Sequence, residues 1–352
     1  MAVASDHDTG PSLEKRAVRH ADLVPCLNAF VDSRTPGSDR KENFTIIGPG
    51  VSENPNQHVH IPEAHGFNIG GARQPPGCLN SQHSHLTAEV FVVHSGEWVF
   101  RFGVDARDGE VHLAPGDTIS IPTRMFRGFE NVGEDTGFLF AVLGGDDPGR
   151  VTWAPQVFEL AARHGLVLLA GGKLVDTTAG ETVAFDAVRE TPPSPDEIAA
   201  LATPAADRLA SCVARADAPT DESDAMRVAN WSGSGVRARR IIDDDPAGGA
   251  AIASWWPHGF SLTRLQLEAG AGTGRRAIER PGVLFVQSGP VLVDVDDARI
   301  ALDAGDTLSL PRGARASIHA PTETPAVGSG EASAGVFVVE GTPAAAGVAG
   351  EG

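Results

Sequence analysis

Short apolar runs separated by polar turns predict that this chain is rich in β-strands. Residues 90–93 and 98–102 are apolar runs of strand length, and the Ser-Gly-Glu tripeptide at 95–97 has the composition of a tight turn between them. The segment FNIGGAR at 67–73 is a further strand-like run. Strands that follow one another through such short turns are typical of antiparallel sheets. We therefore expect an all-β fold here.

The same pattern occurs a second time further along the chain. The tripeptide His-Gly-Phe at 65–67 has a counterpart at 258–260, and APGDTISIP at 114–122 is similar to DAGDTLSLP at 303–311. A repeat of this length indicates duplicated architecture. The sequence thus predicts two related β-domains.

The segment between the two copies carries helix signals. Residues 154–164 look helical, with a proline near the start. The sequence Ser-Pro-Asp-Glu at 194–197 predicts another helix start, because Ser caps a helix, Pro fits its first turn and acidic groups favour its positive end. This second helix is expected to run to about Arg215. Residues 216–235 are polar and are interpreted as a linker.

Composition and charge narrow the class of function. The net charge of −18 argues against a nucleic-acid-binding or anionic-membrane-binding surface. No apolar run approaches the roughly 18 residues of a membrane span, and the first residues lack a signal-peptide hydrophobic region. The three cysteines are far apart and form no CxxC, so we expect no disulfide framework and a reducing, cytoplasmic location.

The most informative polar residues lie in GCLNSQHSHLTAEVFVVHSG at 77–96. Side chains alternate along a strand, so His83 and His85 are expected to point the same way. Glu89 follows a short turn and can approach from the next strand. Two imidazoles and a carboxylate are the ligand set of the facial triad, which leaves coordination positions open on a metal. We therefore predict a metal site at His83, His85 and Glu89.

This spacing resembles the first conserved motif of the cupin superfamily. The family's second motif, Gly-x5-Pro-x-Gly-x2-His-x3-Asn, is similar to the segment that begins at Gly116, with Pro122 and Asn131 in the expected places. Two positions differ: Arg124 stands where the family has Gly, and Arg127 stands where it has the last metal-binding His. The resemblance implies two jelly-roll β-barrels joined by a partly helical segment.

The resemblance and the repeat together predict the domain organisation. We expect an N-terminal extension (1–55), a metal-binding cupin barrel (56–150), a helical linker region (151–240), a second, degenerate cupin barrel (241–342) and a disordered tail (343–352). Residues 1–16 are also expected to be disordered. The second barrel is called degenerate because the positions that correspond to the ligands and to Arg127 hold Arg276, Ile278, Gly282 and Ala316.

Arg127 admits two roles. An arginine is always protonated and cannot ligate a cation. Its planar guanidinium could hold a substrate carboxylate or phenolate beside the metal. Alternatively it could pair with Glu89 and take the metal's place, which would leave a metal-free pocket. A fixed positive charge within about 5 Å of a divalent ion costs several kcal/mol unless an anion intervenes.

Other residues are weaker candidates for the site. Asn68 and Arg73 lie on the strand-like run 67–73 and could reach the barrel mouth to bind a substrate. Phe91 and Phe129 could contact an aromatic substrate. The pair His58-x-His60 has metal-ligand spacing but lacks the downstream Glu, so a second metal site there is disfavoured.

The resemblance implies a metal-dependent oxygenase. We expect an Fe(II) dioxygenase whose partners are dioxygen and a small anionic phenolic or enolic substrate; Zn, Mn, Ni or Cu are the alternative metals. Glu89, as ligand or base, and Arg127, as the group that steers the substrate anion, are the catalytic candidates. Two other classes stay open: a non-oxidative metal-dependent lyase, isomerase or cyclase, and a metal-free module that binds a small anion. The expected assembly is a homodimer.

Overall fold

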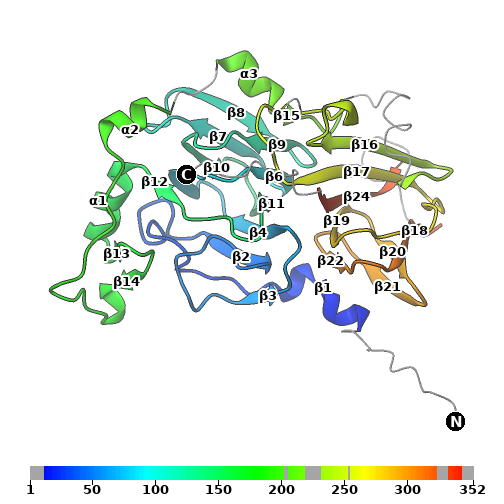
Figure 1. Ribbon diagram of the computed structural model, residues 1–352, viewed down its shortest axis with the longest axis horizontal. Helices are drawn as coiled ribbons and strands as arrows, with labels where there is room; N and C mark the ends of the chain where they lie inside the picture. The colour runs from blue at the N-terminus through cyan, green and yellow to red at the C-terminus, as the bar shows by residue number, and fades with distance from the viewer. Residues whose placement is uncertain (1–11, 202–204, 219–230, 253, 323–331, 343–352) are drawn as a thin grey trace, which may run out of the picture. The chain divides into compact units, whose positions relative to one another are not determined.

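The computed structural model describes residues 12–201, 205–218, 231–252, 254–322 and 332–342 (Figure 1). The chain is mostly β, as expected, and it divides into two compact units. The first unit holds the described residues of 23–221, 240–262 and 341–352, and the second unit holds those of 1–22, 222–239 and 263–340. Each unit contains a barrel made of two antiparallel sheets.

The first unit is built from a seven-stranded and a five-stranded sheet. In spatial order the larger sheet contains β15 (Val213–Ala214), β9 (Thr118–Ile121), β6 (Glu89–Ser95), β11 (Gly137–Gly144), β4 (Phe67–Gln74), β2 (Glu42–Ile47) and β3 (Val59–Ile61). The smaller sheet contains β12 (Thr152–Trp153), β5 (Leu79–Ser84), β10 (Arg127–Asn131), β7 (Trp98–Phe102) and β8 (Gly109–Leu113). These pairs are antiparallel except β2 with β3.

Alternation along the strands builds the core between these two sheets. Phe91 and Leu139 on the larger sheet and Phe100 and Phe129 on the smaller one belong to a single buried apolar cluster. Burying one face of each sheet against the other is the arrangement of a jelly-roll barrel. It leaves the inward positions at one end of the barrel available for polar side chains.

The first barrel begins earlier in the chain than predicted. The segment 1–55 was expected to be an extension, but it supplies β2, which pairs with β4 in the larger sheet. The main chain of Cys26 also bridges to Asn43 on β2. The loop before β2 is thereby attached to the barrel, and residues from about 23 onward belong to the first unit.

The first barrel also takes up a segment that was assigned to the second. The second barrel was expected to begin at residue 241, but the segment 243–259 belongs to the first unit. Within it, the His258 imidazole Nε2 lies 2.7 Å from the Ser120 hydroxyl on β9, and both side chains are buried. A short 3-10 turn (Pro246–Gly248) lies in the same segment.

The middle of the chain is only partly helical. Helix α1 (Pro155–Arg163) confirms the helix predicted at 154–164, and it is followed by the hairpin β13 (Leu166–Leu168) and β14 (Leu174–Asp176) and a 3-10 turn (Thr177–Ala179). Helix α2 (Pro195–Ala199) starts with the predicted capping box, formed by Ser194 and Glu197.

The helix predicted to continue to about Arg215 is wrong. Helix α2 ends at Ala199, and a separate helix α3 (Ala206–Ser211) follows. The sequence has a proline at position 204, which lacks the amide donor that a continuous helix would need there. Within the described residues, no helix is long and apolar enough to cross a membrane.

The second unit repeats the barrel. Its larger sheet has the order β1 (Ala17–Val18), β22 (Thr307–Leu310), β19 (Gly282–Ser288), β24 (Ala332–Gly341), β17 (Phe260–Glu268) and β16 (Val236–Ile242). Its smaller sheet has the order β18 (Arg276–Ala277), β23 (Arg315–His319), β20 (Val291–Val295) and β21 (Ala298–Leu302).

Two 3-10 turns (Leu13–Arg16, His20–Asp22) flank β1, so the disorder predicted up to residue 16 does not extend over 13–16. Residues 1–11, most of the predicted linker and the tail 343–352 lie outside the described residues.

Candidate metal centre

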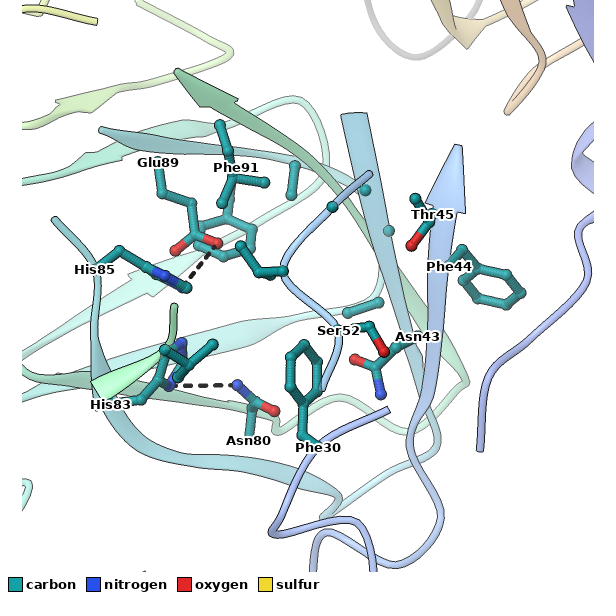
Figure 2. A pocket seen from close by; sticks show the side chains of 18 of the residues that line it. Phe30, Asn43, Phe44, Thr45, Ser52, Asn80, His83, His85, Glu89 and Phe91 are labelled. Carbon is teal, nitrogen blue, oxygen red and sulfur yellow. Dashed lines mark hydrogen bonds and ion pairs between the residues drawn. The ribbon is translucent and has the colours of Figure 1, made fainter. Parts of the chain in front are cut away.

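Three potential metal ligands meet inside the first barrel. One nitrogen each from His83 and His85 and one carboxylate oxygen of Glu89 lie within 4.8 Å of one another, and all three residues are buried. His83 belongs to β5, His85 follows its last residue, and Glu89 begins β6 (Figure 2). The His-x-His spacing places both imidazoles on one side of the chain, and the turn at 86–88 brings the carboxylate back toward them.

The protonation of the two imidazoles suits metal binding. His83 Nδ1 lies 2.7 Å from the carbonyl oxygen of Ser81, so Nδ1 carries the proton and Nε2 keeps a free lone pair. Burial, and then the positive charge of Arg127, lowers the pKa of His83 and of His85 well below the usual range. His85 Nε2 lies 3.7 Å from Glu89 Oε1, and its buried Nδ1 has no hydrogen-bond partner among the described residues. The donor set is therefore two neutral imidazoles and one carboxylate, which fits a divalent transition metal.

Arg127 is the ion partner of Glu89. It lies opposite His83 in the ladder between β10 and β5, and its buried guanidinium pairs with Glu89 Oε2 and donates from Nη1 to the His83 carbonyl at 3.2 Å. Burial raises the pKa of Glu89, and the guanidinium opposes that rise. The two carboxylate oxygens thus face different groups: Oε2 faces Arg127, and Oε1 faces His85. The ion pair between Arg127 and Glu89 is the second of the two roles predicted for Arg127. It still leaves Glu89 Oε1 directed toward His85.

The three ligands open into a cavity of about 70 Å³ with aromatic walls. Phe30, Phe91, Phe129 and Trp153 contribute to its lining, and Figure 2 shows Phe30 and Phe91 on different sides of it. Asn43 also lines the cavity, and its buried amide nitrogen has no hydrogen-bond partner among the described residues. A cavity of this size holds a few waters or a compact ligand, and Asn43 offers such a ligand a hydrogen-bond donor.

Three of the five predicted substrate-binding residues do not line the cavity. The Asn68 amide is used within the protein, because it accepts from the Gly50 amide at 2.9 Å and donates to the Gly145 carbonyl at 2.7 Å. Arg73 pairs with Glu42 and lies over the Phe44 ring at 4.9 Å, and it does not line the cavity. Asn68 therefore fixes a loop, and Arg73 belongs to the outer face of the sheet. Arg127 does not line the cavity either.

Sequence reasoning missed much of the cavity wall. Trp153 comes from β12, with its ring 5.2 Å from that of His83, and Phe30 and Asn43 come from the segment taken for an extension. None of them belongs to a motif. The only available signal was the apolar strand pattern of 44–47, which alternation could have assigned to a barrel strand.

The other positions with ligand-like spacing are engaged differently. His60 Nδ1 lies 2.9 Å from the Thr45 carbonyl, and its Nε2 accepts from the Val24 amide at 3.1 Å, so both ring nitrogens are occupied. In the second barrel Arg276, at the position of His83, pairs with Glu340 at 2.9 Å and lies 4.6 Å from the centre of the Trp231 ring.

Comparisons with known proteins agree with this architecture. Residues 72–143 match the family described as Cupin domain. A germin-like protein (subfamily 1 member 7) of Arabidopsis thaliana is 35% identical over 88 residues, which is 24% of this chain and 38% of the relative. The chain therefore spans well under half the length of that curated relative.

Two solved structures resemble nearly the whole chain. Vicilin from hazelnut (Corylus avellana) has a TM-score of 0.52 at 13% identity and covers 93% of this chain and 85% of its own. A deletion mutant of Bacillus subtilis oxalate decarboxylase has a TM-score of 0.51 at 11% identity, with 93% and 76% covered. At these identities the likeness concerns the fold alone.

Proposed function

We propose that this chain, a two-barrel protein with a cupin domain at residues 72–143, is a metal-dependent enzyme that acts on a small anionic substrate in its first barrel. The metal would be held by His83, His85 and Glu89. The reaction we favour is oxygenation of a phenolic or enolic compound by Fe(II) and dioxygen. The observation that carries the proposal is the meeting of three buried donors at the end of an aromatic cavity.

The ligand set supports an open metal site. Three protein ligands leave coordination positions for exogenous groups, and bound iron would supply the electron chemistry and those positions to a substrate and to dioxygen. His83 and His85 are held neutral by burial, so they are ready to ligate near neutral pH. Glu89 directs Oε1 toward them while Arg127 holds Oε2.

The charges at the site support an anionic substrate. Glu89 and Arg127 together are neutral, so a divalent ion would leave the centre with two net positive charges. In a low-dielectric cavity that excess is best compensated by a ligand with negative charge. Arg127 thereby favours an anion through its charge, although it does not touch the cavity. The aromatic wall of Phe91, Phe129 and Trp153 suits a flat ring, and the Asn43 amide can donate to an acceptor oxygen on it.

A second candidate rests on the Arg127–Glu89 ion pair. Because Arg127 already neutralises Glu89, the cavity could bind a small molecule without any metal. In that case the two neutral imidazoles would act only as hydrogen-bonding groups. Metal content separates this binding module from the enzyme.

The test is metal analysis followed by oxygen uptake. The protein should be purified without added metal and analysed by mass spectrometry of the elements, and we expect iron at close to one atom per chain. Oxygen consumption is then measured with a panel of phenolic and enolic acids, and at least one acid should be consumed with oxygen. Absence of Fe, Zn, Mn, Ni and Cu would favour the metal-free module. A bound metal without oxygen uptake across the panel would point to a non-oxidative reaction.

A further inference from the structure

A β-bulge lies next to the first metal ligand. In the ladder between β5 and β10, His83 pairs with Arg127 and Asn80 pairs with Phe129, so two residues of β5, 81 and 82, stand opposite Gly128 alone. A side chain at position 128 would lie 2.0 Å from the Gln82 amide oxygen and 2.7 Å from the Asn80 carbonyl, which explains the glycine. Bulges leave backbone groups unpaired and redirect neighbouring side chains. Here the bulge lets both Asn80 and His83 face the cavity.

The backbone groups of the bulge find other partners. The Ser81 amide donates to Asp32 Oδ2 at 3.0 Å, and the Ser81 carbonyl accepts the Nδ1 proton of His83 at 2.7 Å. Asp32 thus takes the place that a strand partner would have, at the amide of the residue whose carbonyl fixes the His83 ring. A misplaced Ser81 carbonyl would release Nδ1, and with it the tautomer that leaves Nε2 free for a metal.

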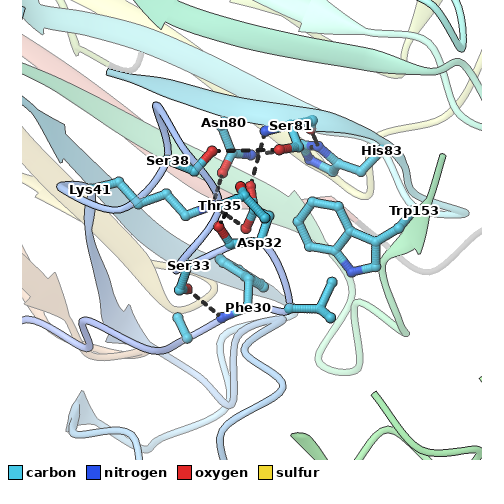
Figure 3. A network of polar contacts seen from close by, with 12 residues as sticks. Phe30, Asp32, Ser33, Thr35, Ser38, Lys41, Asn80, Ser81, His83 and Trp153 are labelled. Atoms are coloured by element: carbon cyan, nitrogen blue, oxygen red, sulfur yellow. Dashed lines mark hydrogen bonds and ion pairs between the residues drawn. The ribbon is translucent and has the colours of Figure 1, made fainter. Parts of the chain in front are cut away.

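The Asp32 carboxylate is itself held by a buried lysine (Figure 3). Lys41 pairs with Asp32 Oδ1 and donates to Asn80 Oδ1 at 2.6 Å, and both charged side chains are fully buried. The ammonium lies 5.4 Å from the centre of the Phe30 ring and 5.8 Å from that of Trp153, two walls of the cavity. Removing two charges from water is costly, and apolar residues often stabilise a fold as well as such a pair does. A role beyond stability is therefore needed to explain it.

We propose that Asp32 is a positioning residue for His83, with Lys41 as the counter-ion that allows a carboxylate to be buried there. Asp32 acts through the main chain of Ser81: its acceptor oxygen holds the Ser81 amide and with it the bulge, and the bulge fixes the orientation and tautomer of the imidazole. The inference rests on the proposed metal site, since its consequence is the affinity of that site. What matters is the acceptor oxygen at position 32 and not the charge.

Two double variants separate the acceptor from the charge. Asp32→Asn/Lys41→Met removes both charges and keeps an amide oxygen for the Ser81 amide. Asp32→Leu/Lys41→Met removes both charges and the acceptor as well. Both avoid a lone buried charge, and circular dichroism establishes that each is folded. Co²⁺ alone is the probe, with its dissociation constant and absorption spectrum as readouts. A second, metal-free readout is the ring ¹⁵N spectrum of His83, which reports the nitrogen that carries the proton.

The expected results differ between the two variants. The Asn/Met variant should bind Co²⁺ with the wild-type spectrum and about the wild-type affinity, while the Leu/Met variant should lose about tenfold or more in affinity, as is usual when a group behind a ligand is removed. The Leu/Met variant should also lose the single Nδ1-protonated form of His83.

Wild-type Co²⁺ affinity and an unchanged His83 spectrum in the Leu/Met variant would overturn the inference. So would a folded Asn/Met variant with weakened binding, and that outcome is decisive even if the Leu/Met variant does not fold. If the wild-type protein binds no Co²⁺, the proposed function fails, and the His83 spectra of the metal-free variants still decide the positioning role.

Discussion

Arg127 and His83 are direct partners in the ladder between β10 and β5, and the Arg127 guanidinium donates to the His83 carbonyl at 3.2 Å. The same guanidinium pairs with the Glu89 carboxylate. A fixed cation is therefore hydrogen-bonded to the main chain of one proposed metal ligand, His83, and ion-paired with the side chain of another, Glu89. In the related cupin motif this position carries a metal-binding His. At the corresponding position here, Arg127 would compete electrostatically with a bound metal for Glu89.

The first prediction concerns Arg127→Met. Without the guanidinium, a buried Glu89 carboxylate is left unpaired, which should destabilise the metal-free protein by roughly 3–5 kcal/mol. A divalent cation can take over the lost charge. We therefore expect added Co²⁺ to raise the melting temperature of this variant more than that of the wild type. Thermal unfolding with and without metal measures both effects.

Arg73→Met provides the control for that experiment. It also removes an arginine from a carboxylate, that of Glu42, but Arg73 is partly exposed and does not line the cavity. Its melting temperature should respond to Co²⁺ as the wild type does. An equal response to metal in Arg127→Met and the wild type would show that Arg127 and the metal do not share Glu89.

The second prediction concerns the metal content of histidine variants. His83→Ala and His85→Ala should each lose most of the bound metal, because each removes one of the three proposed protein ligands. His58→Ala is the matched control, since it belongs to the other His-x-His pair of the chain. Elemental analysis of the purified variants gives the result. Full metal content in His83→Ala would show that the ligand assignment is wrong.

The proposed ligands could be predicted because their geometry is local. His83 lies on β5 and His85 follows two residues later, just past the end of that strand, and Glu89 is one turn away, so alternation along an extended chain brings them together. The bulge at 81–82 does not disturb this relationship, because it precedes both histidines. Phe91 lies two residues beyond Glu89 on the same strand face, and it lines the cavity for the same reason.

The rest of the cavity depends on contacts between distant segments. Asn43, Trp153 and Phe30 come from β2, β12 and the loop before β2, and no spacing rule links them to the motif. Arg73 was misplaced because a strand has two faces and only pairing shows which one is buried: β4 puts it on the outer face, beside Glu42. Asn68 is buried as expected of an inward residue, but its side-chain amide is hydrogen-bonded to main-chain groups of loops and does not face the cavity. The register of strand pairs and the contacts of loops are set by the tertiary structure, so the sequence motif could not reveal them.

The third prediction concerns the second barrel. Arg276 occupies the position of His83 there and is committed to Glu340 and the Trp231 ring. Arg276→Met should therefore lower the melting temperature modestly, in line with about 1 kcal/mol for a partly exposed ion pair and cation–π contact. It should leave the metal content at the wild-type value, near one atom per chain. A fall in metal content would reveal that the second barrel contributes to binding.

The fourth prediction concerns pH and Glu53. This carboxyl is buried beside the cavity wall, where it accepts from the Trp153 ring nitrogen at 2.6 Å and from the Val31 amide at 2.7 Å. Burial raises its pKa from 4.5 to about 8. Between these two values the unfolded chain is ionised and the folded protein keeps the proton. Stability should thus fall as pH rises through this range, by roughly 1.4 kcal/mol per pH unit from this group, and then level off.

Glu53→Gln tests this dependence directly. Glutamine has the shape of the protonated carboxyl and retains an oxygen for the Trp153 ring nitrogen, but it cannot ionise. The variant should be somewhat less stable than the wild type at pH 5, because its amide nitrogen cannot accept from the Val31 amide. From pH 5 to above pH 8 the wild type should lose roughly 4 kcal/mol of stability relative to the variant if the whole shift is realised. Melting temperatures of both proteins from pH 5 to pH 9 measure the gap. Parallel curves would mean that Glu53 is already ionised in the fold, and that the wall formed by Trp153 is held by a carboxylate instead of a neutral acid.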